Sequence, residues 1–417
     1  ARSRRWRTRH RCSGWPCSGT PRRARTRDCS TSSSRLRDRA ATAGDNHPVT
    51  RLNRLAIAAG AASALGALAA AGRGVNAAMG GRPAGARLER MKRSAAYRAG
   101  AFHNTSRGTS SMPSGQRDVL RRFRDSSETR KPARPIPVVS ASHEPRPDGL
   151  HITWFGHASC LVELDGARIL LDPVWSDRCS PSQHVGPKRL HAVPVPLTGL
   201  GRVDAVVISH DHYDHLDMDT IRQLCQLTSA VFVVPLGVGA HLETWGVSAH
   251  RIVECDWEDG HDVAGVRITA VEAQHFSGRG LRRDGTLWAS WVLSGAGGRV
   301  FFSGDTGYFD GYPRIGAEHG PFDALLMAVG AYDPAWHDIH LDPEEAVEAA
   351  VAMGGGLVLP IHWCTFVLAP HPWAEPVERL LAAADTAGVE VTVPKVGQRI
   401  DPAEPPAADP WWAQLDA

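Results

Sequence analysis

Four potential metal ligands lie within six residues, in the run His-Asp-His-Tyr-Asp-His at 210–215. They are His210, His212, Asp214 and His215, and they follow an apolar run at 205–208 that is typical of a strand. Three imidazoles this close repel one another when protonated, and each loses solvation free energy if it is buried without a partner. A divalent cation that accepts their lone pairs removes both penalties. The run therefore predicts a metal site, and the alternative is a His-rich surface loop.

Three further candidate ligands each follow an apolar run of their own. His275 follows the run at 266–271, Asp305 follows the run at 299–304, and His362 follows the run at 357–361. Taken singly, each could be a hydrogen-bonded residue at the end of a strand. One loop cannot complete a catalytic metal site, however, and these three together with residues 210–215 indicate such a site.

The chain from residue 151 onward consists of short apolar runs separated by Gly, Pro and Asp, which predicts an α/β layered domain. Asp165-Gly166 predicts a hairpin between two of the strands. A helix is predicted to start at Asp342, which would be its N-cap, with Pro343 at the first helical position and Glu345 in the first turn. We expect strands at 152–155, 160–164, 168–171, 203–208, 231–234, 266–272, 288–293, 299–302, 324–328 and 356–361, and helices at 217–228, 237–245, 343–353 and 374–387.

Composition divides the 417 residues unevenly. The apolar fraction of 42% and the charged fraction of 22% are typical of a globular protein. Residues 1–40 carry thirteen Arg and two Asp, a net charge of +11, so the rest of the chain carries −8 of the total of +3. The five cysteines after residue 48 are scattered and contain no C-x-x-C, so they do not indicate a disulfide framework.

We predict five segments. Residues 1–48 form an Arg-rich head, either disordered or non-native, with a nucleic-acid-binding arm as the alternative. Residues 49–75 form an Ala-rich hydrophobic segment that includes the charge-free stretch 55–72, and we expect an N-terminal membrane anchor or a signal peptide there. Residues 76–145 are a basic connector, residues 146–400 are the α/β domain, and residues 401–417 are a tail.

The order of the candidate ligands resembles the metallo-β-lactamase superfamily pattern: His-x-His-x-Asp-His, a later His, a Gly-Asp strand end and a final His. The resemblance implies a four-layer αββα sandwich with a largely unstructured N-terminal extension, and two divalent metal ions. Zn²⁺ suits the His-rich ligand set best, with Fe or Mn as alternatives. One metal would be held by His210, His212 and His275, the second by Asp214, His215 and His362, with Asp305 bridging the two.

Two other segments also resemble this superfamily, Thr153–Ser159 and the strand end Leu171-Asp172-Pro173. The resemblance implies that Asp172 orients the ligands by hydrogen bonding, as carboxylates behind metal-binding imidazoles do. For His157, inside the first of these segments, a structural role and a functional role both stay open.

Longer motifs resemble the branch of the superfamily that contains N-acyl-phosphatidylethanolamine-hydrolysing phospholipase D. They are the segments 172–183, 186–189, 330–332, 340–346 and 361–363. This resemblance implies that His340 lies beside the metals and assists catalysis. Ile339 departs from the branch, because the animal enzyme has Gln at this position.

The chemistry that these residues would support is hydrolysis by a hydroxide that two metals activate. We expect the substrate to be a phosphodiester such as an N-acyl-phosphatidylethanolamine-like phospholipid. A lactonase acting on a sugar phosphate or an acyl lactone is the alternative: an apolar cavity would favour lipid, and a small basic pocket would favour a sugar phosphate. A nucleic-acid-binding protein with structural metals is a more distant alternative. A redox di-iron role is disfavoured, because this chain has His212 at the position where oxygen-reducing relatives in the superfamily would be expected to have a carboxylate.

Overall fold

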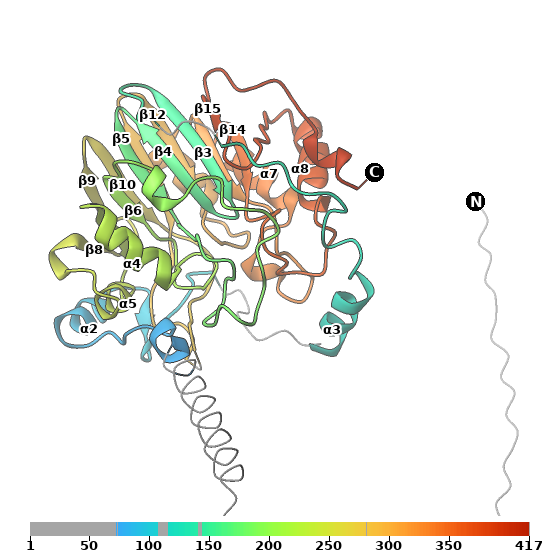
Figure 1. Ribbon diagram of the computed structural model, residues 1–417. Helices are drawn as coiled ribbons and strands as arrows, with labels where there is room; N and C mark the ends of the chain where they lie inside the picture. Colours follow the sequence, from blue (N-terminus) through green and yellow to red (C-terminus); the bar gives the residue numbers. More distant parts are fainter. Residues whose placement is uncertain (1–71, 73, 107–115, 141–143, 281, 417) are drawn as a thin grey trace, which may run out of the picture. The chain divides into compact units, whose positions relative to one another are not determined.

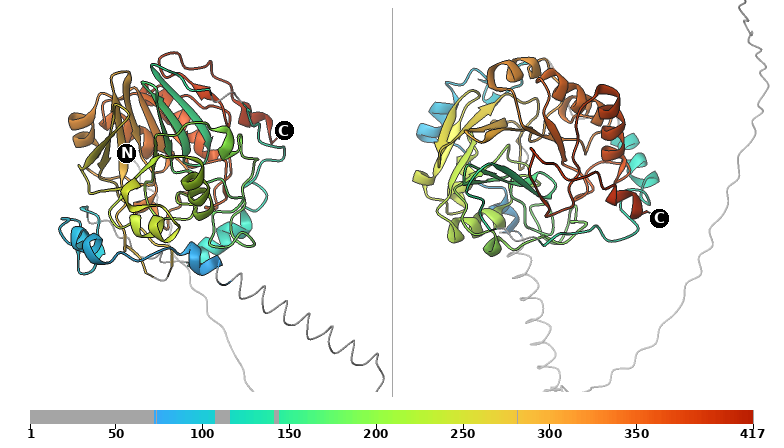
Figure 2. Two further views of the ribbon diagram at one scale, coloured as in Figure 1. Left: turned by 60° about the vertical axis from the view of Figure 1, so that its left-hand side comes forward. Right: turned by 90° about the horizontal axis from the view of Figure 1, so that it is seen from above.

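The computed structural model describes residues 72, 74–106, 116–140, 144–280 and 282–416, all within the compact unit Ala62–Ala417. Two β-sheets pack face to face, and helices cover their outer faces (Figures 1 and 2). This arrangement confirms the expected αββα sandwich. Residues 1–71 lie outside the described part of the chain, and so does the predicted Arg-rich head.

The first sheet has seven strands in the order β15-β3-β4-β5-β6-β7-β8. Strands β3, β4 and β5 pair antiparallel, and β5 to β8 pair parallel. The hairpin between β4 and β5 turns at Asp165 (φ 51°) and Gly166 (φ 81°), as the sequence predicted. The strands are β3 (Leu150–Gly156), β4 (Ser159–Leu164), β5 (Ala167–Leu171), β6 (Ala205–Val207), β7 (Val231–Pro235), β8 (Ile252–Cys255) and β15 (Arg399–Ile400).

The second sheet has six strands in the order β14-β13-β12-β11-β10-β9. Its strands β9 to β12 pair antiparallel, and β12 to β14 pair parallel. The strands are β9 (Gly260–Val263), β10 (Val266–Val271), β11 (Ser290–Gly295), β12 (Gly298–Phe302), β13 (Ala324–Ala328) and β14 (Leu357–Ile361).

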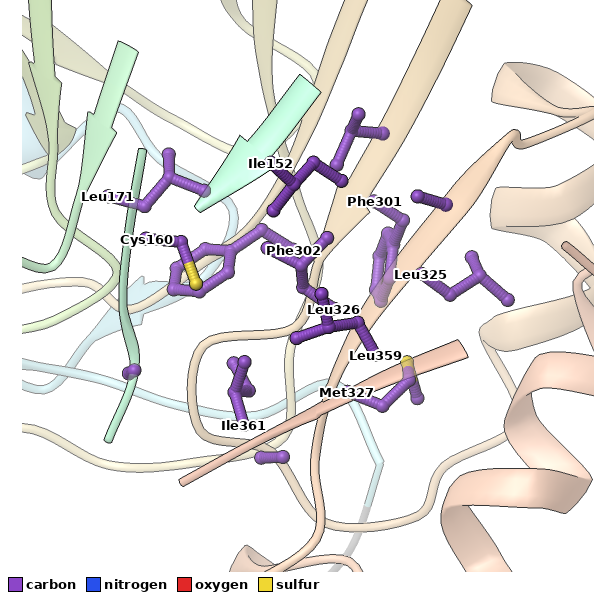
Figure 3. Packing of buried hydrophobic residues seen from close by; sticks show 14 of the residues in the cluster. Ile152, Cys160, Leu171, Phe301, Phe302, Leu325, Leu326, Met327, Leu359 and Ile361 are labelled. Carbon is purple, nitrogen blue, oxygen red and sulfur yellow. The ribbon is translucent and has the colours of Figure 1, made fainter. Parts of the chain in front are cut away.

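The strands of the first sheet are apolar on both faces because both faces are covered. In β4, Cys160 and Val162 pack into the core between the sheets, whereas Leu161 points the other way into a second core beneath the helices. Side chains alternate between the two faces of a strand, so a run of consecutive apolar residues supplies both cores. The inter-sheet core is visible in Figure 3, where the labelled side chains are Ile152, Cys160, Leu171, Phe301, Phe302, Leu325, Leu326, Met327, Leu359 and Ile361.

Helices cover the two outer faces. Ile221 and Leu242 belong to the core on the outer face of the first sheet, and Val347 and Leu380 pack into the core that includes the second sheet. The predicted helix start at Asp342 is confirmed as a capping box, because Asp342 accepts from the Glu345 backbone and the Glu345 side chain accepts from the Asp342 backbone. The helices are α4 (Met218–Leu227), α5 (Gly239–Thr244), α6 (Tyr312–His319), α7 (Pro343–Ala352) and α8 (Glu375–Ala387).

Some elements differ from the predictions for identifiable reasons. The strand expected at 288–293 begins at Ser290, because the Ala289 N–H donates to the Ser209 carbonyl instead of pairing within the sheet. Strands β8, β9 and β15 and helix α6 were not predicted from the sequence. In β9 only Val263 is apolar, and the strand exists through its pairing with β10 at the edge of the sheet.

The segment expected to be a connector contains α2 (Gly85–Met91), β1 (Tyr97–Arg98), β2 (Ala101–Phe102) and α3 (Gln116–Asp125). Met91 and Phe102 pack with Leu236 and Trp288 in a small separate core. The expectation of an N-terminal membrane anchor is corrected: within the described ranges, no helix is both long and apolar enough to cross a membrane. Residues 49–71 and 73 of the predicted hydrophobic segment lie outside those ranges.

Candidate active site

The run at 210–215 connects the end of β6 to the start of α4 as a tight turn. The His215 and Leu216 N–H groups both donate to the His212 carbonyl, at 3.1 and 2.8 Å. Behind the turn, the buried Asp172 carboxylate accepts from the Ser209 N–H at 2.7 Å and lies 2.7 Å from Nδ1 of His215. This contact directs the other ring nitrogen of His215 into the site. Asp172 thus lies behind a ligand, where the resemblance to the superfamily places it.

A first group of donors gathers around His212. Its Nδ1 lies 2.7 Å from Nε2 of His210 and 3.3 Å from Nε2 of His275. Oδ2 of Asp305 lies 3.8 Å from Nε2 of both His210 and His275. One ligand atom from each of these four residues lies within 4.8 Å of the others, so the group could hold a metal ion.

A second group of donors gathers around Asp214. Its Oδ2 lies 2.9 Å from Nε2 of His157, 3.4 Å from Nε2 of His215 and 3.3 Å from Nε2 of His362. These four residues could also hold a metal ion.

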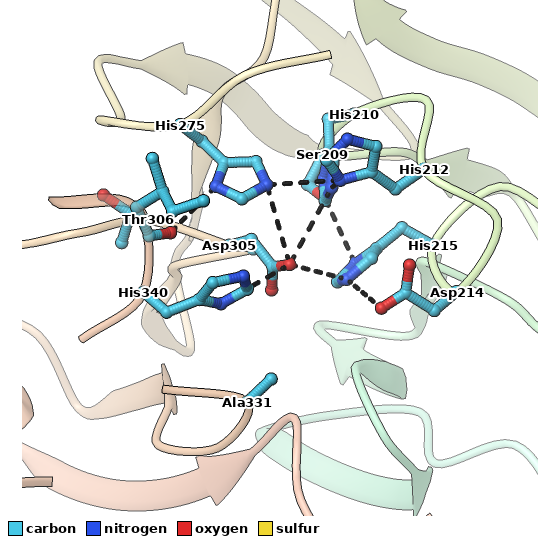
Figure 4. A network of polar contacts seen from close by, with 12 residues as sticks. Ser209, His210, His212, Asp214, His215, His275, Asp305, Thr306, Ala331 and His340 are labelled. Atoms are coloured by element: carbon cyan, nitrogen blue, oxygen red, sulfur yellow. Dashed lines mark hydrogen bonds and ion pairs between the residues drawn. The ribbon is translucent and has the colours of Figure 1, made fainter. Parts of the chain in front are cut away.

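Asp305 lies between the two groups (Figure 4). Its Oδ2 is 3.2 Å from Nε2 of His215, and its Oδ1 is 3.1 Å from Nε2 of His362. The structure thus brings together all seven predicted ligands, from loops that follow β6, β10, β12 and β14.

Unusual backbone conformations cluster at this site. His157, Asp172 and His362 have φ values of 52°, 38° and 65°, in the left-handed region that non-glycine residues seldom adopt. Gly304, just before Asp305, has φ 54°, and a Cβ there would lie 2.5 Å from Cβ of Ser209. Only glycine allows the two ligand-bearing loops to approach this closely. Such strain costs about 1–3 kcal/mol for each residue and is typical of functional sites.

The pKa values of the donor residues are shifted in opposite directions. Burial lowers the pKa of His210 and His275 well below the usual value. Burial acts the same way on His362, but the carboxylates of Asp305 and Asp214 together outweigh it, and the pKa rises to about 9. For Asp305 burial would raise the pKa, but His215 and His362 hold it well below its usual value. The buried carboxylates therefore require positive charge nearby, which a divalent cation would supply.

The donor atoms fit a metal ion by chemistry as well as by position. Nε2 of His215, Oδ1 of Asp305 and Nδ1 of His340 are buried, and none of their close contacts with other described residues has the geometry of a hydrogen bond. The two groups offer imidazole nitrogens and carboxylate oxygens without a thiolate, a set that suits Zn, Mn or Fe.

His340 lies at the edge of the site, with Nδ1 at 4.0 Å from Oδ2 of Asp305. Burial lowers the pKa of His340 to about 4, although Asp305 opposes this shift. The preceding residue, Ile339, acts through its backbone, because its carbonyl lies 2.8 Å from Nδ1 of His275. That contact directs Nε2 of His275 into the site. Because it uses the backbone carbonyl, Ile339 can orient His275 without the Gln side chain.

Two residues that were not predicted as part of the site complete its geometry. His157, whose role the sequence left open, joins the second group directly, and its place in the Thr153–Ser159 segment was the available signal. Ser209 connects Asp172 to the first group, because its Oγ lies 2.5 Å from Oδ2 of Asp172 and 2.9 Å from Nδ1 of His210. A serine immediately before a ligand has no distinctive pattern in sequence.

The chain is similar to several known proteins. A β-lactamase superfamily domain model matches residues 167–363. An uncharacterised protein of Mycobacterium tuberculosis is 53% identical over 326 residues, which cover 76% of this chain and 87% of that protein. N-acyl-phosphatidylethanolamine-hydrolysing phospholipase D 1 of Caenorhabditis elegans is 34% identical over 264 residues, which cover 60% of this chain and 74% of that protein.

The solved structure of Igni18, a metallo hydrolase of the archaeon Ignicoccus hospitalis, matches with a TM-score of 0.48 at 22% identity, over 60% of this chain and 97% of that one. Together with the fold and the donor groups, the relatives establish that the chain belongs to the metallo-β-lactamase superfamily and is a metal-dependent hydrolase of that kind. The resemblance to the branch of N-acyl-phosphatidylethanolamine-hydrolysing phospholipase D is likewise confirmed.

Proposed function

We propose that this chain is a phosphodiesterase with two metal ions, acting on a phospholipid of the N-acyl-phosphatidylethanolamine type. The observation that carries the proposal is that Asp305 lies between two donor groups. It belongs to the group with His210, His212 and His275, and its oxygens lie 3.2 Å from Nε2 of His215 and 3.1 Å from Nε2 of His362 in the other group. His340 lies beside it. The Caenorhabditis elegans relative, whose name states hydrolysis of such a lipid, supports the substrate.

His210, His212 and His275 would hold one metal, and Asp214, His215 and His362 the other, with Asp305 between them and His157 near the second. Zn²⁺ is the metal that we propose, with Fe or Mn as the alternatives. Divalent cations in such a site lower the pKa of bound water and neutralise phosphate oxygens.

His340 would position the reacting phosphoryl group. Its low pKa makes the ring neutral near pH 7, and a neutral ring can donate one hydrogen bond from its N–H. Nδ1 of His340 is buried beside Asp305 and has no hydrogen-bond partner among the described residues, so a phosphoryl oxygen held next to Asp305 would give it one. We infer that His340 stabilises the leaving or phosphoryl oxygen by a hydrogen bond rather than as an imidazolium.

The competing functions find less support. A lactonase acting on a sugar phosphate would need a basic pocket, whereas the cavity that His340 lines carries four carboxylates and two guanidinium groups. A nucleic-acid-binding role rests on the Arg-rich head, residues 1–48, which lies outside the described residues.

The test is hydrolysis by the metal-loaded protein of bis(p-nitrophenyl) phosphate and of N-acyl-phosphatidylethanolamine in mixed micelles. Asp305→Ala should reduce both rates by about a hundredfold or more, because it removes the carboxylate that lies between the two donor groups. Asp262→Ala, which removes an exposed carboxylate on β9, should retain full activity. Opening of an acyl lactone with both diesters left intact would instead assign the lactonase function.

A further inference from the structure

The segment 74–106 precedes the stretch that matches the superfamily domain, yet it packs against a loop that carries a metal ligand. Phe102 belongs to the same small core as Ala273 and Trp288. These two residues lie in the loop between β10 and β11, and the same loop carries His275. The segment is therefore placed where it can act on this ligand.

Asn104 joins the segment to the backbone of His275. Its Nδ2 donates to the His275 carbonyl at 2.9 Å, and its Oδ1 accepts from the His275 N–H at 3.1 Å. Oδ1 also accepts from Nε1 of Trp288 at 3.0 Å. A primary amide offers both a donor and an acceptor, whereas a carboxylate only accepts and an aliphatic side chain does neither. Asparagine is therefore suited to pair with both backbone groups of one residue.

The sheet does not hold His275 in place. Strand β10 ends at Val271, and residues 272–278 belong to no helix or strand. His275 is nevertheless completely buried, so its N–H and carbonyl need partners within the protein. Asn104 supplies a partner for both groups, in the way that a neighbouring strand would.

The imidazole of His275 is fixed from its other side. Its Nδ1 lies 2.8 Å from the Ile339 carbonyl, and its Nε2 lies 3.3 Å from Nδ1 of His212 and 3.8 Å from Oδ2 of Asp305 (Figure 4). A metal site requires its ligands to be held to within about 0.5 Å. The Ile339 carbonyl sets the direction of the ring, and Asn104 sets the position of the backbone that carries it.

We propose that Asn104 is a positioning residue of the metal site and that it acts by holding His275 in the first donor group. A segment outside the superfamily domain thereby contributes to metal binding. The proposal rests on the proposed function only in that the donor groups bind metal, and it does not depend on the substrate. Its effect should fall on the metal held by His210, His212 and His275, because His275 is the ligand that Asn104 contacts.

Two substitutions and one control isolate this role. Asn104→Ala removes all the hydrogen bonds of the amide, whereas Asn104→Asp keeps the acceptor and places a second oxygen against the His275 carbonyl. Ser94→Ala is the matched control, because Ser94 is buried in the same segment and its partners are not metal ligands. Its Oγ donates to Oδ1 of Asp256 at 3.0 Å and accepts from the Ala96 N–H at 3.2 Å.

The experiment measures zinc affinity by competition with a chromophoric chelator, and the stability of the metal-free protein by urea unfolding. Both Asn104 variants should weaken the binding of one zinc ion by about tenfold or more, since residues behind a metal ligand typically contribute about 10–100-fold. Ser94→Ala should leave zinc affinity unchanged. If Asn104→Ala does not fold, Asn104→Asp carries the test, because it retains the acceptor for both N–H donors.

A double substitution shows whether Asn104 acts through His275. In a His275→Ala background, Asn104→Ala should change zinc affinity by less than about twofold, because the residue through which it acts is absent. An equal loss of affinity with and without His275 would overturn the proposal, since Asn104 would then act on the fold as a whole.

Hydrolysis by the zinc-loaded wild type separates this proposal from the proposed function. If bis(p-nitrophenyl) phosphate and N-acyl-phosphatidylethanolamine are both left intact, but Asn104→Ala still weakens zinc binding in a His275-dependent way, the proposed reaction fails and the positioning role stands. If the diesters are cleaved and Asn104→Ala binds zinc as tightly as the wild type, the positioning role is overturned and the proposed function is intact.

Discussion

Replacing Asp172 by Asn should weaken metal binding without a direct change in either donor group. Asp172 is fully buried, and its Oδ2 faces two groups: Oγ of Ser209 at 2.5 Å and Nδ1 of His215 at 2.7 Å. A carboxylate accepts from both, whereas an asparagine has only one oxygen and must present its NH₂ group to the remaining donors. The ring of His215 then loses its charged partner and its fixed orientation.

The size of the effect follows from the contacts. Losing a buried hydrogen bond to a charged group costs about 2 kcal/mol, which corresponds to about a thirtyfold loss of affinity. Carboxylates behind metal-binding imidazoles have effects of similar size, about 10–100-fold. We therefore expect the dissociation constant of the metal nearest His215 to rise by about thirtyfold.

Competition with a chromophoric chelator would measure this affinity, and urea unfolding of the metal-free protein would measure stability separately. Glu163→Gln is the control, because Glu163 is a buried carboxylate that pairs with Arg168 and Arg399 at the opposite end of β4. It should destabilise the fold and leave metal affinity unchanged. If Asp172→Asn binds metal as tightly as the wild type, or if the two variants lose affinity equally, the role given to Asp172 is refuted.

Three further predictions concern stability. Chelation of the metals should lower the free energy of unfolding by about 4 kcal/mol, compared with protein in free metal at about a thousand times the dissociation constant. Added zinc should restore the stability. Calorimetry that shows no change on chelation would contradict a metal site. Burial, with Arg189 nearby, lowers the pKa of His191 from 6.5 to about 4, so its stabilising contribution is complete above about pH 6.5 and is lost as the pH falls toward 4. Between pH 7 and pH 5 the wild type should lose about 2 kcal/mol from this group, and urea titrations of His191→Gln should lack that loss. Leu325→Ala, in the inter-sheet core, should cost about 2–5 kcal/mol by urea unfolding, and a loss below 1 kcal/mol would contradict its burial.

Elements with a local signal could be predicted from the amino-acid sequence. Runs such as 160–164 and 168–171 became buried strands because both faces of the first sheet are covered, so consecutive apolar residues are needed. The hairpin at Asp165-Gly166 and the capping box at Asp342 were predictable because each depends on a few neighbouring residues and their backbone groups. The metal site at 210–215 was also predictable, because its candidate ligands are neighbours in the sequence.

Contacts between residues far apart in the sequence could not be predicted in this way. The contact of His157 with Asp214 joins the end of β3 to the loop after β6, and it depends on the left-handed backbone at His157. The cavity beside His340 combines Arg122 of α3 with Arg379 of α8, which are far apart in the sequence. Strand β9 likewise exists because β10 offers a free edge, not because its own residues favour a strand. Contacts of this kind depend on how the sheets and helices pack, and packing is a property of the whole chain, so no local pattern records it.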